Sequence, residues 1–394
     1  MSLSTLPLSY CTNVHAGRSV EEVQQGLTEY TTIVREKIGH PLAAGLWLAA
    51  PVVEELLSKE QLFVGFAERL TNLGLTCHTL NAFPFGDFHS ERVKENVYVP
   101  DGSQPQRLEY TEQCADVLGR LMPEGTEGSI STVPLGFKPF DHAGDFLDGC
   151  VLQLLELARH LDELHDQTGK LIRLAIEPEP FCLIETTDEA ISFFDRLRDT
   201  ADAKQVGEIV QRHLGLCYDV CHQAVEFEDV AESIRALHIA DVRINKVHIT
   251  CALQLDHPAE NPEAREALAR YVEPRYLHQT FARNAAGQIH KVVDLTEQLA
   301  GELSAEFIDA EQWRIHFHVP VDAEQLGPLK TTRSELKQAL AAVADLEYAP
   351  HLEVETYTWE VLPGKDSTDL VDGLTRELQA TEELLADLRS QSST

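Results

Sequence analysis

Short apolar runs alternate with longer segments of helical spacing along almost the whole chain. Apolar runs of this length predict buried β-strands, and apolar residues at intervals of three or four predict helices that cover them. The predicted strands are Leu8–Val14, Gly45–Ala49, Leu75–Asn81, Ser129–Val133, Leu171–Glu177, Leu214–Asp219, Ile244–Thr250 and His351–Tyr357. Eight strands alternating with helices favour a closed α/β barrel, a (β/α)8 or TIM barrel, over an open doubly wound sheet.

The segment before the last strand interrupts this alternation. Within Tyr276–Leu295, the run Asn284-Ala285-Ala286-Gly287 separates two strand-like stretches, and this predicts an inserted β-hairpin. Arg314–Val321 has the composition of a ninth strand. The pattern leaves open whether this stretch joins the barrel or belongs to the insertion and folds over the mouth of the barrel.

These patterns predict one barrel domain and a terminal helix. The barrel domain covers residues 1–365 and contains an insertion, a β-hairpin and helical excursion over about residues 252–312. An acidic amphipathic pattern over residues 366–394 predicts a C-terminal helix packed on the barrel, followed by a frayed tail.

The composition narrows the choice of partners. The net charge is −33, and no basic stripe compensates for it, so we do not expect nucleic acid as a partner. No apolar run reaches the length of a membrane span, and the eight cysteines form no Cys-x-x-Cys pair. We therefore expect a cytoplasmic protein with reduced thiols that binds a small molecule. The sequence does not determine its oligomeric state.

Four predicted strands direct polar side chains toward the barrel interior. Alternate residues of a strand face opposite sides, and the outward set in a barrel is apolar because helices cover it. By this rule Glu177, Asp219 and His248 point inward at the carboxyl ends of their strands. Glu353 and Glu355 of the last strand do the same. The carboxyl ends of barrel strands form the catalytic face, so this agreement indicates a functional site.

Carboxylates gathered inside a barrel require a positive charge beside them. A single Glu at a strand end is more often an ion-pair partner than a functional residue. Burying three carboxylates together costs many kcal/mol unless a cation neutralises them. Oxygen and imidazole donors suit a divalent ion such as Mn²⁺, Mg²⁺, Co²⁺ or Zn²⁺. We expect one such metal ion, bound by Glu177, Asp219, His248 and Glu355.

The order of these residues resembles that of a known family. Asp219-Val220-Cys221-His222 is similar to the Asp-x-x-His signature of xylose isomerase-like sugar epimerases and isomerases. The resemblance covers about residues 8–250 and 350–360, and the insertion departs from it. It implies that Glu177 and Glu355 bind the metal and act as the catalytic acid–base pair. It also implies that His222 contacts the substrate.

Three further runs resemble a smaller family, the barrel proteins of bacterial ebo gene clusters, which are described as metabolite traffic proteins. These runs are Ser9–His15, His316–Pro320 and His351–Trp359. This resemblance implies a small-metabolite ligand and adds little about chemistry.

Other polar residues are weaker candidates for substrate contacts. Glu179 follows Glu177 in Glu-Pro-Glu-Pro, where a simple loop carboxylate is an equal alternative. His316 and His318 share one face of a predicted strand, either as a functional pair or as structural histidines. Asn13 and His15 end the first strand and Asn81 ends the third, so we expect them to line the pocket.

These features predict a divalent-metal-dependent isomerase or epimerase. Two glutamates across a metal-bound hydroxy-carbonyl can remove a proton from one face and return it to the other. We expect a small polyhydroxylated metabolite as substrate: a sugar, sugar acid or cyclitol, with or without phosphate. A cyclitol dehydratase would use the same site. The alternative is a protein without catalytic activity, a barrel that only binds a metabolite. Simple binding, however, does not require two buried bases.

Overall fold

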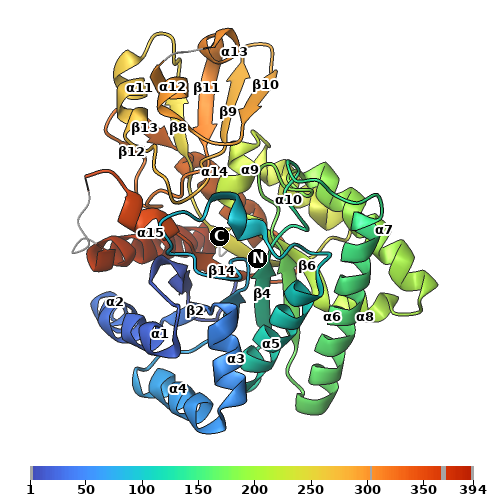
Figure 1. The fold of residues 1–394 in the computed structure, drawn as a ribbon. Helices are drawn as coiled ribbons and strands as arrows, with labels where there is room; N and C mark the ends of the chain where they lie inside the picture. Colours follow the sequence, from blue (N-terminus) through green and yellow to red (C-terminus); the bar gives the residue numbers. More distant parts are fainter. Residues whose placement is uncertain (1–2, 302–303, 365–369, 392–394) are drawn as a thin grey trace.

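The computed structural model describes residues 3–301, 304–364 and 370–391. Eight parallel strands close a barrel in the order β1-β14-β7-β6-β5-β4-β3-β2, and helices surround it (Figure 1). The strands are β1 (Ser9–Cys11), β2 (Ala43–Trp47), β3 (Thr79–Asn81), β4 (Gly128–Thr132), β5 (Ile172–Ile176), β6 (Leu214–Asp219), β7 (Ile244–Ile249) and β14 (His351–Val354). The predicted barrel is therefore confirmed.

The helices pack their apolar faces on the outer side of these strands. They are α1 (Val20–Gly26), α2 (Thr32–Ile38), α3 (Ala50–Ser58), α4 (Glu60–Asn72), α5 (Pro105–Leu121), α6 (Phe146–Thr168), α7 (Thr187–Ala203), α8 (Gly207–His213), α10 (Val230–Ile239) and α14 (Arg333–Ala344). Local sequence sets their ends. Thr186 and Glu189 form a capping box at the start of α7, and Gly169 ends α6 in a left-handed conformation.

Several barrel strands are shorter than the apolar pattern predicts, and β1 and β3 differ most. β1 ends at Cys11 because the chain turns into a 3₁₀ helix over Thr12–Val14. β3 covers only the last residues of the predicted Leu75–Asn81. In both cases the polar residue of the predicted strand end still lies at the mouth of the barrel, because Asn13 and Asn81 line the same pocket.

The insertion is larger than the predicted hairpin with helices. It is a six-stranded sheet in the order β10-β9-β11-β8-β13-β12, at one end of the barrel (Figure 1). Its strands are β8 (Leu253–Asp256), β9 (Thr280–Asn284), β10 (Ile289–Val292), β11 (Ala310–Ile315), β12 (Gln325–Leu326) and β13 (Leu329–Thr331), with helices α11 (Pro262–Ala269), α12 (Glu297–Gly301) and α13 (Ala305–Ile308). The β9–β10 hairpin turns at Gly287, whose φ of +80° favours glycine.

The open question about Arg314–Val321 is resolved by β11. This strand pairs with β8 and β9 inside the insertion sheet, so it is not a barrel strand. The ladder ends at Ile315, where Phe317 N–H donates to Ile315 O and turns the chain. The expectation that His316 and His318 share a strand face is therefore wrong, since both follow the strand in irregular backbone.

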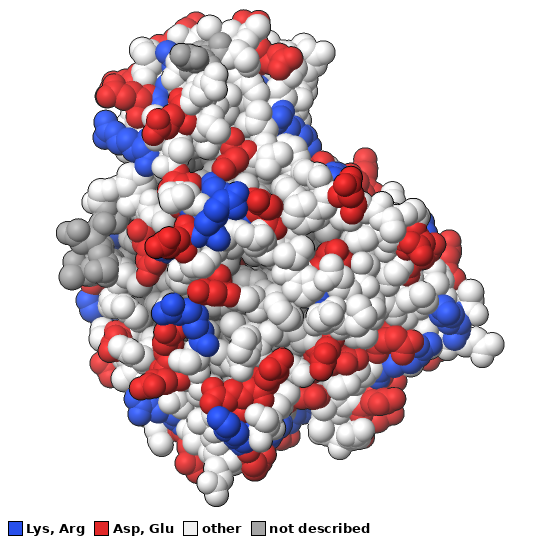
Figure 2. All heavy atoms as spheres, viewed as in Figure 1, with Lys and Arg blue, Asp and Glu red and all other residues white. Residues whose placement is uncertain are grey.

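The C-terminal helix α15 (Leu370–Gln391) packs on α2 and buries Leu374, Leu378 and Leu385. The start predicted at residue 366 and the predicted frayed tail at 392–394 lie outside the described residues. A search of the described helices finds none with the length and apolar character of a membrane span. On the face in Figure 2, acidic side chains are spread over barrel and insertion with Lys and Arg between them.

Candidate functional site

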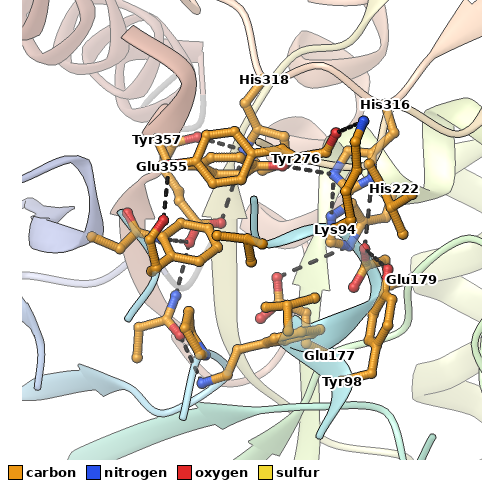
Figure 3. A pocket seen from close by; sticks show the side chains of 18 residues that line it. Lys94, Tyr98, Glu177, Glu179, His222, Tyr276, His316, His318, Glu355 and Tyr357 are labelled. Carbon is orange, nitrogen blue, oxygen red and sulfur yellow. Dashed lines mark hydrogen bonds and ion pairs between the residues drawn. The ribbon is translucent and has the colours of Figure 1, made fainter. Parts of the chain in front are cut away.

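A pocket of about 510 Å³ opens at the carboxyl ends of the barrel strands (Figure 3). It is lined by Asn13, Asn81, Phe83, Pro84, Phe88, Val93, Lys94, Val97, Tyr98, Glu177, Glu179, His222, Tyr276, Leu277, His316, His318, Glu355 and Tyr357. The lining combines polar side chains with aromatic and aliphatic ones. A pocket with a few convergent polar groups among apolar side chains suits a small molecule.

Four buried residues on separate strand ends converge at the floor of this pocket. We call Glu177, Asp219, His248 and Glu355 the carboxylate cluster, since one donor atom of each lies within 4.8 Å of the others. His248 Nδ1 lies 2.8 Å from Glu177 Oε1, 3.1 Å from Glu355 Oε2 and 3.6 Å from Asp219 Oδ2. The four residues predicted as metal ligands are thus brought together.

Strand register and a helix cap position these side chains. Asp219 pairs with His248 across β6 and β7, and His248 pairs with Glu353 across β7 and β14. Asp219 also caps α9 (Val220–Val225), because its Oδ1 accepts from His222 N–H at 3.0 Å. Thr250 Oγ1 donates to the same oxygen at 2.7 Å. The cap fixes one carboxylate oxygen and leaves Oδ2 facing the cluster.

The donor set fits a divalent ion. Within the described chain, Glu177 Oε2 and Asp219 Oδ2 are buried and have no hydrogen-bond partner. Buried carboxylate oxygens without a partner are costly unless a cation binds them. Three carboxylates and one imidazole are donors that Mn²⁺, Mg²⁺, Co²⁺ and Zn²⁺ accept.

The surroundings separate the acidities of the carboxyl groups in the cluster. Burial raises the pKa of Glu177 to about 7, although the neighbouring His248 opposes it. Burial also acts to raise the pKa of Glu355, but His248 and His318 outweigh it and bring that pKa to about 2. For Asp219, the rings of His222, His318 and His248 outweigh burial and hold its pKa well below its usual value. Unequal carboxyl groups in one site are typical of acid–base chemistry.

Two side-chain amides orient Glu355 by binding the carboxylate oxygen that does not face His248. Asn13 Nδ2 and Asn81 Nδ2 both donate to Glu355 Oε1, each at 2.8 Å. Oε1 is therefore engaged, and Oε2 is the oxygen that faces His248. Asn81 lies where the sequence placed it, and Asn13 has a comparable role.

Glu179 lies higher in the pocket, within a network that sequence reasoning missed. Tyr98 O–H donates to Glu179 Oε1 at 2.6 Å, and Gln279 Nε2 donates to the same atom at 3.3 Å. Burial raises the pKa of Glu179 to about 8 against these hydrogen bonds. Tyr98 belongs to a 3₁₀ helix (Lys94–Tyr98) and Gln279 precedes β9, so no strand pattern placed either of them.

Of the four histidines predicted to line the pocket or contact the substrate, three line the pocket and His15 does not. His222, His316 and His318 lie beside Glu179 and Glu355 (Figure 3). His15 instead points away from the pocket. Its ring stacks on Tyr30 and its Nε2 lies 2.9 Å from Tyr10 Oη. The 3₁₀ turn after β1 directs Asn13 inward and carries His15 past the mouth.

A buried ion pair lies beneath the cluster, and the sequence analysis identified only one of its two residues. The strand pattern placed Glu353 inside the barrel, without a role. Lys246 Nζ lies 2.5 Å from Glu353 Oε2, and both side chains are fully buried. His248 Nε2 lies 3.2 Å from the same oxygen. Lys246 stands two residues before His248 on β7, so the same alternation would have found it.

Comparisons with known proteins identify only distant structural similarity. No family model and no curated protein matches the chain. A D-tagatose 3-epimerase-like protein is 12% identical with a TM-score of 0.48, covering 98% of this chain and 100% of its own. A xylose isomerase-like TIM-barrel protein from Mycobacterium smegmatis in complex with magnesium is 15% identical with a TM-score of 0.46, covering 98% and 99%. The IolI protein with a bound zinc atom is 12% identical with a TM-score of 0.46, covering 98% and 99%.

Proposed function

We propose that this protein is a divalent-metal-dependent isomerase or epimerase of a small polyhydroxylated metabolite, a sugar, sugar acid or cyclitol. The observation that carries the proposal is the convergence of Glu177 and Glu355, which both line the pocket, on His248 Nδ1. Their strands β5 and β14 are separated by β6 and β7, so the two carboxylates approach the pocket from well-separated directions.

The two glutamates are proposed to move the proton. Glu177 lines the pocket, so its carboxylate can take a proton from, or return one to, a substrate C–H. Glu355 approaches from the other side, with its Oε1 held by Asn13 and Asn81. One carboxylate removes the proton from one face, and the other carboxyl group supplies a proton to the opposite face.

An ion bound to the carboxylate cluster would supply the remaining chemistry. When bound, it polarises a substrate carbonyl and lowers the pKa of the adjacent C–H bond. The chain's own residues then position the substrate. Glu179 has the raised pKa of a carboxyl group that can donate to a substrate hydroxyl, with Tyr98 and Gln279 fixing its orientation.

The wall of the pocket indicates a ring-shaped substrate. Phe83, Phe88, Tyr98, Tyr276 and Tyr357 contribute aromatic surface to the lining of the pocket. Aromatic rings pack on the C–H face of a sugar or cyclitol ring while its hydroxyls meet the carboxylates. A pocket lined by both aromatic rings and carboxylates therefore suits a cyclic polyol.

The pocket does not offer a free cation to a phosphate group. Lys94 Nζ lies 2.6 Å from Asp294 Oδ2 and donates to the backbone oxygens of Tyr276 and Glu273 at 2.5 and 3.0 Å. Among the described residues that line the pocket there is no arginine. Phosphate recognition relies on available Arg or Lys side chains, so we propose an unphosphorylated substrate.

The test is deuterium exchange in D₂O. Wild-type protein loaded with Mn²⁺ is incubated with ketoses, aldoses, sugar acids and ketocyclitols, and deuterium at carbon is read by mass spectrometry and NMR. With the true substrate, E177Q and E355Q are expected to lose about 10²–10⁴-fold in exchange rate, because Gln keeps the volume but is no base. E232Q, at an exposed position of α10, is the matched control and is expected to exchange at the wild-type rate.

The outcome separates this proposal from its competitors. A product that lacks one water relative to the substrate, without epimer formation, indicates a cyclitol dehydratase. Exchange at the wild-type rate in both E177Q and E355Q contradicts the two-glutamate mechanism. Tight ligand binding with no exchange at all supports the alternative of a non-catalytic metabolite-binding protein, which the resemblance to metabolite traffic proteins suggests.

A further inference from the structure

A hollow at the amino ends of β5, β6 and β7 has four arginines in its lining. They are Arg173 near the start of β5, Arg243 immediately before β7, Arg198 of α7 and Arg212 of α8. The candidate pocket opens at the carboxyl ends of the same parallel strands. The hollow and the candidate pocket therefore lie at opposite ends of the barrel.

Three of these arginines have a carboxylate partner. The pairs are Arg173 with Glu127, Arg198 with Asp195 and Arg212 with Asp162. A carboxylate beside a guanidinium offsets much of its charge and accepts from its N–H groups. The fourth arginine of the lining, Arg243, is different.

The Arg243 guanidinium has no hydrogen bond or ion pair to the residues that the structure describes, and its Nε is buried. It stacks on Tyr348, with its central carbon 3.9 Å from the ring centroid. The two carboxylates of the lining, Asp241 and Glu347, are exposed, and neither pairs with Arg243. A buried donor without an acceptor costs free energy, and a bound anion would offset that cost.

Arg173 places a second positive charge beside Arg243. The two arginines precede, by one residue each, Leu174 of β5 and Ile244 of β7, and both of these residues pair with β6. The arginines thus flank the start of β6 from the strands on either side. Burial is the main cause that lowers the pKa of Arg243, and the charge of Arg173 lowers it further. An anion between the two guanidinium groups would relieve their repulsion.

Arg173 keeps a donor for such an anion. Its Nε donates to Arg212 O at 3.0 Å, and its Nη1 donates to Glu127. Its Nη2 has no partner within the described parts of the chain. The hollow therefore offers N–H donors from two guanidinium groups on separate strands.

We propose that this hollow binds the phosphate group of a small metabolite between Arg173 and Arg243. A phosphate has three peripheral oxygens and up to two negative charges, so it accepts from guanidinium groups on two strands at once. A planar carboxylate is better suited to a single guanidinium fork. Because the hollow lies at the far end of the barrel, its ligand is distinct from the substrate of the candidate site. The inference does not depend on the proposed reaction.

Calorimetric titration with inorganic phosphate tests this site. A chelator is present, so that phosphate cannot bind through a metal ion at the carboxylate cluster. We expect one saturable equivalent in wild type. R243Q is expected to lose about 10–100-fold in affinity, because charge-assisted hydrogen bonds to the phosphate are removed. R235Q, at an exposed position of α10, is the matched control and is expected to bind phosphate as wild type does.

A second variant changes the affinity in the opposite direction, in case R243Q fails to fold. E127Q removes the half-exposed carboxylate that competes for Arg173, so phosphate affinity should rise about 2–5-fold. No saturable binding to wild type, equal affinity in wild type and R243Q, or unchanged or weaker binding in E127Q overturns the proposal.

Acetate at the same ionic strength distinguishes the two kinds of oxyanion. We expect it to bind more weakly than phosphate, and acetate binding as tight as that of phosphate would overturn the assignment of a phosphate group. A chain that binds phosphate here but epimerises nothing would leave this site standing and contradict only the proposed function.

Discussion

His248 and Glu353 face each other across adjacent strands, with His248 Nε2 3.2 Å from Glu353 Oε2. The other ring nitrogen, Nδ1, points into the carboxylate cluster. With a metal ion at Nδ1, the ring proton would lie on Nε2, beside the Glu353 carboxylate. Glu353 is in turn held by Lys246, so the ion pair below the site positions the imidazole above it.

This relationship predicts that E353Q lowers metal affinity about 10–100-fold without removing a ligand. Breaking the buried pair with Lys246 also costs about 3–5 kcal/mol of stability, because the lysine is left with an uncompensated charge. Titration calorimetry and denaturant unfolding measure the two effects. The double variant K246M/E353L should regain stability over E353Q but not metal affinity. Wild-type affinity in both variants would show that Glu353 does not position His248.

Gly45 provides a steric test of the same carboxylate. A Cβ at this position of β2 would collide with Glu353 Oε1 and approach Tyr10 O to 3.0 Å. We expect G45A to destabilise the protein by about 1–3 kcal/mol and to weaken metal binding by displacing Glu353. G65A in α4 is the control, because nothing lies within 4 Å of its Cβ. That variant should gain about 0.5–1 kcal/mol of stability from helix propensity. Equal effects of the two substitutions on unfolding would contradict this account.

The barrel and its cluster could be predicted because strand alternation is a local property of the sequence. A barrel fixes which residues face inward, so Glu177, Asp219 and His248 followed from the apolar residues beside them. Asn81 followed in the same way. Closure of the barrel then brings these side chains together, because the carboxyl ends of the strands must meet at one mouth.

The insertion and its contribution could not be predicted in this way. Whether β11 pairs with barrel strands or with β8 and β9 depends on contacts between distant segments, and the strand pattern is the same in both cases. The sequence identifies His316 and His318 as candidates but places them on a strand, whereas both lie in irregular backbone, where no periodicity applies. Tyr98 and Gln279 are connected to Glu179 by hydrogen bonds that span 81 and 100 residues of chain. Sequence alone has no signal for such pairs.

Metal removal should destabilise the wild-type protein but not D219N. The ion offsets repulsion among buried carboxylates, and at a free metal concentration of 1,000 times Kd it contributes about 4 kcal/mol. Asn at position 219 can still accept from His222 N–H and Thr250 Oγ1 through its Oδ1, so the cap of α9 should survive. We expect a chelator to lower the Tm of wild type by several degrees and to leave the Tm of D219N unchanged. A chelator effect of equal size in both proteins would contradict the role of Asp219 as a ligand.

The stability of the protein should also depend on pH through Glu377 of α15, a residue that is not part of the candidate site. Its Oε1 accepts from Thr356 Oγ1 at 2.6 Å and from Val321 N–H at 3.0 Å, and its Oε2 accepts from Trp359 Nε1 at 2.9 Å. Burial outweighs these hydrogen bonds and raises the pKa of Glu377 to about 7. A carboxyl group with a raised pKa binds its proton more tightly in the folded than in the unfolded state. Its stabilising effect is therefore complete below about pH 4.5 and is lost as the pH rises through about 7.

We expect the free energy of unfolding of wild type to fall relative to that of E377Q by up to about 3 kcal/mol between pH 4.5 and 8. Gln carries no titrating proton, and its amide can keep only part of the contacts of Glu377, so E377Q should be less stable at low pH and approach wild type at high pH. Denaturant unfolding at a series of pH values in the presence of a chelator measures the difference, because protonation of the carboxylate cluster is common to both proteins and cancels. E232Q should follow the wild-type curve throughout, since Glu232 is exposed. A stability difference between wild type and E377Q that stays constant from pH 4.5 to 8 would mean that Glu377 does not titrate in this range.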